Sequence, residues 1–242
     1  DYFEALFSAA QVAPEHIPVL CIDGPTASGK GTVAAAVAQR LGYGFLDSGA
    51  MYRITALAAT RAGLAIDAAH ETAIADLARQ LPVHFADGKV WLGHDDVTEA
   101  IRTEEAGMNA SRVSALPAVR EALVHLQHSF RRLPGLVADG RDMGTVIFPG
   151  APLKVFLTAS VECRAQRRHK QLISKGIDTT IDSLRADLQA RDARDMSRSV
   201  APLKPAQDAL VLDSSHLTVE QAVDQVLIWW QERQPFVPRT QG

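Results

Sequence analysis

Cysteine is almost absent from this chain of 242 residues, which contains only Cys21 and Cys163. Cys21 stands in an apolar run and Cys163 in a helical pattern, so we expect two buried free thiols in a reducing compartment and not a disulfide. No apolar run approaches the roughly 18 residues that a membrane-spanning helix needs. The first residues also lack the basic and then apolar order of a signal peptide. These absences predict a cytoplasmic protein with no membrane partner.

An excess of charge of one sign is missing too. The 25 Lys and Arg residues nearly balance the 28 Asp and Glu residues, and the net charge is −3. Such a chain has no overall field that would attract nucleic acid, so any anion must be bound by a local cluster. With 47% apolar residues the chain can bury one core, or two at most.

The clearest motif is a glycine-rich loop that follows the apolar run Pro18–Ile22 and precedes an alanine-rich helical pattern over Val33–Leu41. Strand, glycine loop and helix in this order form a phosphate-binding P-loop. Its backbone N–H groups and the helix N-terminus suit the β- and γ-phosphates of a nucleotide, and Lys30 can reach their oxygens. The loop consists of Gly24, Pro25, Thr26, Ala27, Ser28, Gly29, Lys30, Gly31 and Thr32.

One position departs from the usual P-loop pattern. Gly31 stands where a Ser or Thr normally holds Mg²⁺, and Thr32 follows it. We therefore expect phosphates and water to supply most ligands of the ion, with Thr32 as a candidate through water. Asp139, directly after a predicted buried strand, is the second candidate for holding Mg²⁺ or its waters.

The order of predicted elements indicates an α/β fold with a mostly parallel sheet and helices on both of its faces. Asp87-Gly88 between two short apolar runs predicts a β-hairpin, with a third strand over Val97–Ile101, inside a small antiparallel insertion. The predicted strands are Phe45–Leu46, Leu136–Ala138, Leu153–Leu157 and Ala209–Leu212. The predicted helices are Ala50–Arg61, Ala68–Gln80, a core-facing stripe over Val119–Phe130, a basic helix from Ser160, Ile181–Ser197, and a last helix with a capping box at Thr218 and Gln221 and an apolar stripe from Val219 to Trp230.

A second anion site is indicated by Asp47-Ser48-Gly49 at the start of a helix, with Arg53 one turn further on. A hydroxyl, a helix N-terminus and a guanidinium together can bind a phosphate. The alternative is that Ser48 only caps the helix and that Arg53 is solvated.

A third cluster, Asp139-Gly140-Arg141-Asp142, follows a predicted buried strand, and ligands of open α/β sheets bind beyond such strand ends. Arg141 can clamp a phosphate there, although a charged turn with an internal ion pair is the alternative.

Two basic helices complete the set, with Arg164, Arg167 and Arg168 on the first, and Arg191, Arg194, Asp195 and Arg198 along one face of the second. A solvated, ion-paired surface is the alternative for these helices, whereas opposite a P-loop they would form a mobile lid.

Taken together, these blocks resemble bacterial cytidylate kinases, over roughly residues 17–232. The resemblance implies a P-loop kinase with a CMP-binding insertion (residues 75–113), a lid (160–176), and tails over 1–16 and 233–242. It implies ATP as phosphoryl donor with Mg²⁺, CMP and dCMP as substrates, and a monomeric kinase domain. For the substrate, it implies that the CMP phosphate is bound by Ser48, Arg53 and Arg141, that cytosine is read by Ser111, Arg120, Asp142 and Arg198, and that the ribose is held by Arg191 and Asp195. It also implies that the residues acting in catalysis are Lys30, Arg53, Arg141, Arg191 and Arg194. Contacts to ATP would come from Arg167 and Arg168.

The chemistry of cytosine agrees with these roles, because its amino group needs an acceptor and its N3 and O2 atoms need donors. Asp142 with Arg120, Ser111 and Arg198 would supply that set, and a site with an unpaired acceptor rejects uracil. A kinase for shikimate or another nucleoside monophosphate stays open as an alternative, as does a P-loop module that binds nucleotide without turnover. Such a module would not need the second arginine-lined site.

The first seven residues, Asp1–Phe7, resemble the closing residues of EPSP synthase. The resemblance predicts that a carboxyvinyltransferase domain is covalently fused ahead of the kinase. An unrelated N-terminal helix or an added remnant is the alternative.

Overall fold

The computed structural model describes residues 14–198 and 201–234. The predicted N-terminal segment Asp1–Phe7, most of the C-terminal tail, and Ser199 and Val200 lie outside the described residues. No helix within these two ranges is long and apolar enough to cross a membrane.

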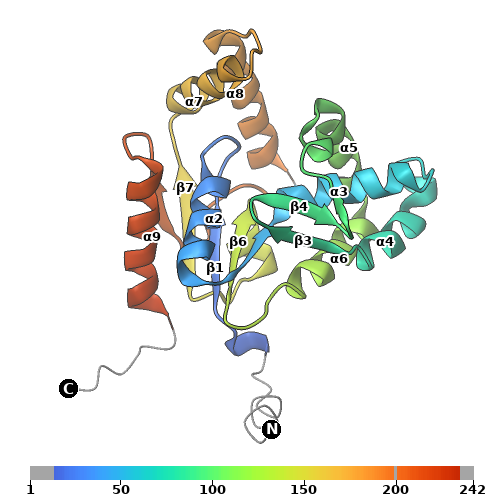
Figure 1. Cartoon of the computed structure of the whole chain (residues 1–242), viewed down its shortest axis with the longest axis horizontal. Helices are drawn as coiled ribbons and strands as arrows, with labels where there is room; N and C mark the ends of the chain where they lie inside the picture. Colours follow the sequence, from blue (N-terminus) through green and yellow to red (C-terminus); the bar gives the residue numbers. More distant parts are fainter. Residues whose placement is uncertain (1–13, 199–200, 235–242) are drawn as a thin grey trace, which may run out of the picture.

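A five-stranded parallel sheet forms the centre of the molecule (Figure 1). Its strand order is β2-β6-β1-β7-β8, and every neighbouring pair is parallel. The strands are β1 (Val19–Asp23), β2 (Gly44–Asp47), β6 (Leu136–Gly140), β7 (Leu153–Thr158) and β8 (Leu210–Asp213). The predicted fold class and its parallel strands are therefore confirmed.

Consecutive residues of β1 point to opposite faces of the sheet, as the pleat of a strand requires. Val19 and Cys21 belong to the core that the helices on one face cover, and Leu20 and Ile22 belong to the core on the other face. Because both faces are covered, β1 is fully buried and reads as a continuous apolar run. The central strand thus delivers the P-loop from the middle of the molecule.

Helices cover both faces, and two more lie beyond the carboxyl ends of the strands (Figure 1). One face carries α2 (Lys30–Leu41) and α9 (Val219–Arg233), and the other carries α3 (Ser48–Arg61), α4 (Glu71–Arg79), α5 (Glu104–Ser114) and α6 (Pro117–His128). The pair α7 (Val161–Ser174) and α8 (Ile181–Ser197) stands above the loop between β1 and α2. Short single-turn helices occur at Pro14–His16, Ala68–His70, Ala100–Arg102 and Met143–Ile147.

The predicted hairpin is confirmed, with β3 (Val83–Ala86) antiparallel to β4 (Lys89–Leu92). Its turn residues Asp87 and Gly88 have φ angles of 56° and 71°, the positive values that a tight hairpin turn demands. The predicted third strand is wrong in position. The strand that pairs with β4 is β5 (Asp95–Asp96).

The segment Val97–Ile101 instead turns into a short helix, with the Ile101 N–H bonded to the Val97 carbonyl. Both apolar side chains are buried in the core, at a spacing of four residues. Burial at that spacing, and not strand pairing, explains the apolar pattern.

Several boundaries set by local chemistry agree with the sequence. The second basic helix spans Ile181–Ser197, and the capping box of Thr218 and Gln221 is present at the start of α9. Two details were wrong. Val219 is half exposed and so lies outside the buried stripe of α9, and Cys163 is only partly buried while Cys21 is fully buried; both thiols are free.

Candidate functional site

The P-loop joins β1 to α2 at the centre of the sheet. Gly29 caps α2 with a φ of 84°, and its carbonyl accepts the N–H of Val33, so the helix N-terminus faces the loop. A Cβ on Gly24 would lie only 2.1 Å from the carbonyl oxygen of Leu157. Position 24 therefore requires glycine, because any side chain there would clash with the backbone of β7.

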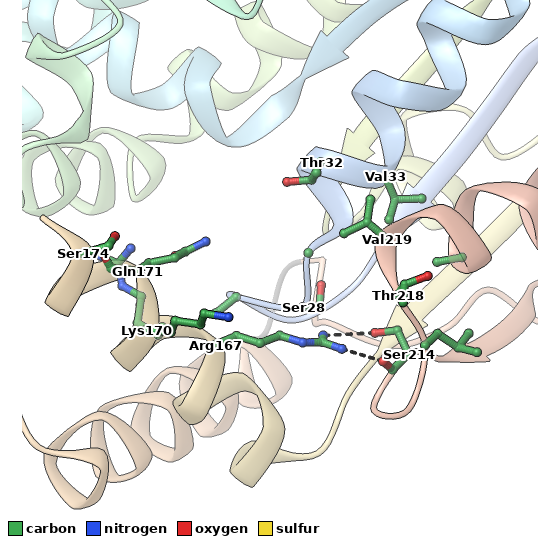
Figure 2. Close-up of a pocket in the computed structure, with 15 residues that line it drawn as sticks. Ser28, Thr32, Val33, Arg167, Lys170, Gln171, Ser174, Ser214, Thr218 and Val219 are labelled. Atoms are coloured by element: carbon green, nitrogen blue, oxygen red, sulfur yellow. Dashed lines mark hydrogen bonds between the residues drawn. The ribbon is translucent and has the colours of Figure 1, made fainter.

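A pocket of about 640 Å³ opens between the P-loop, α7 and the start of α9 (Figure 2). Arg167 spans it from α7 and donates hydrogen bonds to the carbonyl and the hydroxyl of Ser214. Thr32 reaches into it from α2. The predicted ATP residues among its lining are Ala27, Ser28, Gly29, Thr32, Arg167 and Arg168.

The same pocket has an apolar wall that sequence reasoning missed. Leu217, Thr218 and Val219 line it from the start of α9, opposite the side chains of α7. No sequence signal indicated this wall, because the helical spacing assigned Val219 to the core, whereas the structure leaves it half exposed. An apolar wall beside a phosphate-binding loop suits the base or sugar of a nucleotide.

Arg164 was named only as one of the basic residues of α7, yet it is the best-connected one. The side chain is 3% exposed and donates to the Thr26 carbonyl of the P-loop at 3.2 Å. Its guanidinium also forms a two-point pair with Asp192 on α8 and donates to the Ala159 carbonyl. Arg164 thus joins α7, which holds the predicted lid, to the P-loop and to α8.

The second predicted anion site starts at α3. Its N-cap is Asp47, whose carboxylate accepts the Ala50 N–H at 3.1 Å, so the alternative in which Ser48 merely caps the helix is wrong. Ser48 is buried in the first turn. Arg53 is half-buried and donates to the Ile101 carbonyl at 2.7 Å.

Arg53 is one of several guanidinium groups that converge. Burial lowers the pKa of Arg53, and the nearby charges of Arg191, Arg141 and Arg168 lower it further. These arginines come from α3, α8, the end of β6 and α7. Since Arg168 also lines the pocket beside the P-loop, the convergence lies next to that loop. The charge of Asp47 offsets part of this effect, and a bound anion would relieve the repulsion among the arginines.

Arg141 follows β6 and donates to Asp195 of α8 at 3.1 Å. Burial lowers the pKa of Arg141 most, the charge of Asp195 opposes that shift, and Arg198 and Arg191 add to it. Asp195 is buried, and its second carboxylate oxygen has no hydrogen-bond partner. Arg191 and Arg194 are exposed on the same helix.

Two of the predicted base-reading residues, Arg120 and Arg198, lie near a third, Asp142. Burial raises the pKa of its carboxyl group, and the charges of Arg120 and Arg198 act against that rise. Tyr52 belongs to this group although its role was missed, because the Arg120 guanidinium lies 5.9 Å from the centre of its ring. Ser111 is exposed on α5, so its predicted place beside the base is not built into this arrangement.

Three carboxyl groups lie behind the P-loop. Asp139 is buried at the end of β6, where burial and then the charge of Asp47 raise its pKa to about 8, and Asp23 adds to the rise. One oxygen of Asp139 has no hydrogen-bond partner, and the other would lie 3.2 Å from a Cβ on Gly31. In the two described ranges, no group of three or more His, Cys, Asp or Glu residues could hold a metal ion by itself.

Comparison with known proteins identifies the family. The family model described as cytidylate kinase matches residues 20–232. The chain belongs to the cytidylate kinase family. It is 59% identical over 219 residues to a cytidylate kinase of Cupriavidus necator, covering 90% of this chain and 98% of that one. Cytidylate kinases of Chromobacterium violaceum (56% over 218 residues, 90% and 97% covered) and Bordetella pertussis (57% over 226 residues, 93% and 99% covered) are similar to the same extent.

Proposed function

We propose that this protein transfers the γ-phosphoryl group of ATP to CMP and dCMP, which gives ADP with CDP or dCDP. Family membership supports the reaction class. The observation that carries the site is the convergence of Arg53, Arg141, Arg191 and Arg168 beside the P-loop. A module that only binds nucleotide has no use for this second cationic site.

The P-loop site binds ATP, and the arginine-lined site binds CMP. The P-loop and Lys30 hold the phosphates of ATP, while the pocket that α7 and α9 enclose takes its nucleoside part. Ser48, Arg53 and Arg141 hold the phosphate of CMP opposite. An oxygen of that phosphate is already anionic and attacks the γ-phosphorus without a general base, so the residues act by positioning and by neutralising charge.

The selectivity of the enzyme for cytosine comes from Asp142, Arg120 and Arg198. The Asp142 carboxylate accepts from the cytosine amino group, and guanidinium donors serve N3 and O2. Uracil would place an oxygen against that carboxylate, which leaves a buried acceptor unpaired. Ser111 joins the set when α5 moves toward the base. Arg191 and Asp195 bind the ribose, and Arg191 and Arg194 stabilise the transferred group.

Mg²⁺ accompanies ATP, and the residues present fit it. Asp139 has a buried oxygen with no hydrogen-bond partner and a pKa that burial raises, and a cation beside it would favour the charged carboxylate. Thr32 is the other candidate, through water. When bound, the ion neutralises phosphate charge and takes its remaining ligands from phosphates and water.

The boundaries proposed for the moving parts are a CMP-binding insertion over 75–113 and a lid over 160–176, inside a kinase domain over 17–232. The lid residues lie in α7, which can close over the P-loop and exclude water. The monomeric state, the cytoplasmic location and the covalent link to an EPSP synthase domain stay predictions from the sequence.

An ADP-coupled assay with MgATP tests the proposal against CMP, dCMP, UMP, AMP and shikimate. We expect turnover with CMP and dCMP and a kcat/KM for UMP lower by orders of magnitude. Lys30→Met supplies the inactive control, because it removes the ammonium group of the P-loop while it keeps a side chain of similar length. Fast turnover with AMP or shikimate and none with CMP would reject the assignment.

A further inference from the structure

Asp23, the last residue of β1, has so far entered the site only through the effect of its charge on Asp139. It directly precedes Gly24 of the P-loop, and it is 6% exposed. One carboxylate oxygen accepts the Met143 N–H at 2.9 Å, and the other accepts the Gly144 N–H at 2.8 Å. Both oxygens of a buried carboxylate are thus committed to one short segment far away in the sequence.

That segment is the π-helical turn Met143–Ile147, which begins directly after Asp142. The first N–H groups of a helical turn have no partner inside it, and the side chain of the N-cap residue commonly accepts one. Asp142 is the N-cap here, but its side chain makes no capping hydrogen bond. Asp23 accepts these N–H groups instead, from the neighbouring strand.

This exchange of partners leaves the Asp142 carboxylate without a bond to the N–H groups of the turn, and within its own backbone only the Asp142 N–H contributes a hydrogen bond to it. It faces the charges of Arg120 and Arg198, where the proposed base-reading site lies. The same two bonds fix the turn relative to the first residue of the P-loop, and the Gly24 N–H donates to the Gly140 carbonyl of β6 beside them.

We propose that Asp23 is a positioning residue that caps the turn after Asp142, so that Asp142 is free to read the base and is held in register with the P-loop. The proposal rests on the proposed function. Asp23 touches neither nucleotide and acts only through the backbone of Met143 and Gly144.

Asp23→Asn is the sharpest substitution, because it keeps the shape of the side chain. An amide has one acceptor oxygen, so one of the two N–H groups would face an NH₂ group. The turn then loses an acceptor, and Asp142 becomes the nearest replacement. We expect Asp142 to turn toward the N–H groups of Met143 and Gly144 and to discriminate less between cytosine and uracil.

The measurement is the ratio of kcat/KM for CMP to kcat/KM for UMP. Partial unfolding removes active enzyme for both substrates equally and cannot change this ratio. We expect the ratio to fall about tenfold in Asp23→Asn, the size of one lost charge-assisted hydrogen bond, while the KM for ATP stays within about threefold. Val226→Ala, a fully buried truncation in α9, is the structural control and should leave the ratio unchanged while the melting temperature falls.

An unchanged ratio in a folded Asp23→Asn protein would overturn the proposal. Absence of CMP turnover in the unsubstituted protein would instead reject the proposed function. If the variant does not fold, hydrogen exchange of the unsubstituted protein decides. The proposal expects the Met143 and Gly144 amides to exchange as slowly as those of β6, and exchange as fast as that of the exposed Gly150 would overturn it.

Discussion

Arg141 at the end of β6 and Asp195 on α8 are joined by a hydrogen-bonded ion pair of 3.1 Å. The pair connects the central sheet to the helix that carries Arg191 and Arg194. Without nucleotide, it holds in place two side chains that the proposed function assigns to the CMP phosphate and the ribose. Ligand binding therefore acts on a preformed contact.

We expect the Arg141–Asp195 pair to stabilise the free protein. Asp195 is 10% exposed in its side chain and Arg141 is 37% exposed, so a double-mutant cycle with Arg141→Ala and Asp195→Asn should give a coupling of about 1 kcal/mol in urea unfolding. The exposed pair of Arg102 and Glu99 is the control and should show no measurable coupling. A coupling near zero at Arg141–Asp195 would mean that the pair does not hold α8 to the sheet.

Arg53→Ala should reduce kcat/KM for CMP by about 100-fold or more, because it removes a charge that holds the attacking phosphate of CMP. ATP affinity should change little, since Arg53 does not line the pocket beside the P-loop. The control is Arg61→Ala on the same helix, whose partner is the exposed Asp95. Equal losses for CMP and ATP would place Arg53 in the ATP site.

Arg164→Ala should lower the free energy of unfolding by about 3 kcal/mol or more, because Asp192 would keep a partly buried charge without its partner. Arg185→Ala is a matched control, since Arg185 joins the same two helices through the more exposed Glu162 and its loss should change stability little. Urea unfolding compares the two variants. Similar small losses in both would show that Arg164 is not the main link between α7 and α8.

The raised pKa of Asp139, about 8, predicts a pH-dependent stability in the absence of nucleotide. Between pH 4 and pH 8 the folded protein keeps this proton while the unfolded chain has lost it. Stability at this site therefore falls as pH rises through that window, by up to about 1.4 kcal/mol per pH unit. Asp139→Asn removes the titration, so its stability relative to the unsubstituted protein should increase from pH 5 to pH 8. A constant difference across these pH values would contradict a raised pKa.

Features that short stretches of sequence determine were predicted well. The turn at Asp87-Gly88, the start of α9 at Thr218 and the span of α8 depend on neighbouring residues only, and all three are confirmed. Val97 and Ile101 misled the prediction, because burial from another part of the chain produces an apolar pattern without strand pairing. The local sequence alone could not show whether burial or strand pairing produced this apolar pattern.

In the candidate site, sequence patterns predicted a set of charged residues but not the groups that these residues contact. Asp23 and Arg164 each serve backbone groups more than 100 residues away along the chain, and no spacing rule detects such partners. Val219 was misplaced because a helical stripe does not show where the sheet ends and the pocket begins. The sequence analysis found the motifs, but it missed the contacts that form only when distant segments of the chain pack together.

The central claim is that two anion-binding sites are occupied at once, one on the P-loop and one on the arginines opposite. Titration calorimetry of CMP into protein saturated with a non-hydrolysable ATP analogue tests it most directly. The account predicts one CMP bound per chain with the analogue still in place, and loss of that binding in Arg53→Ala. Displacement of the analogue by CMP, as for two ligands of a single site, would contradict it.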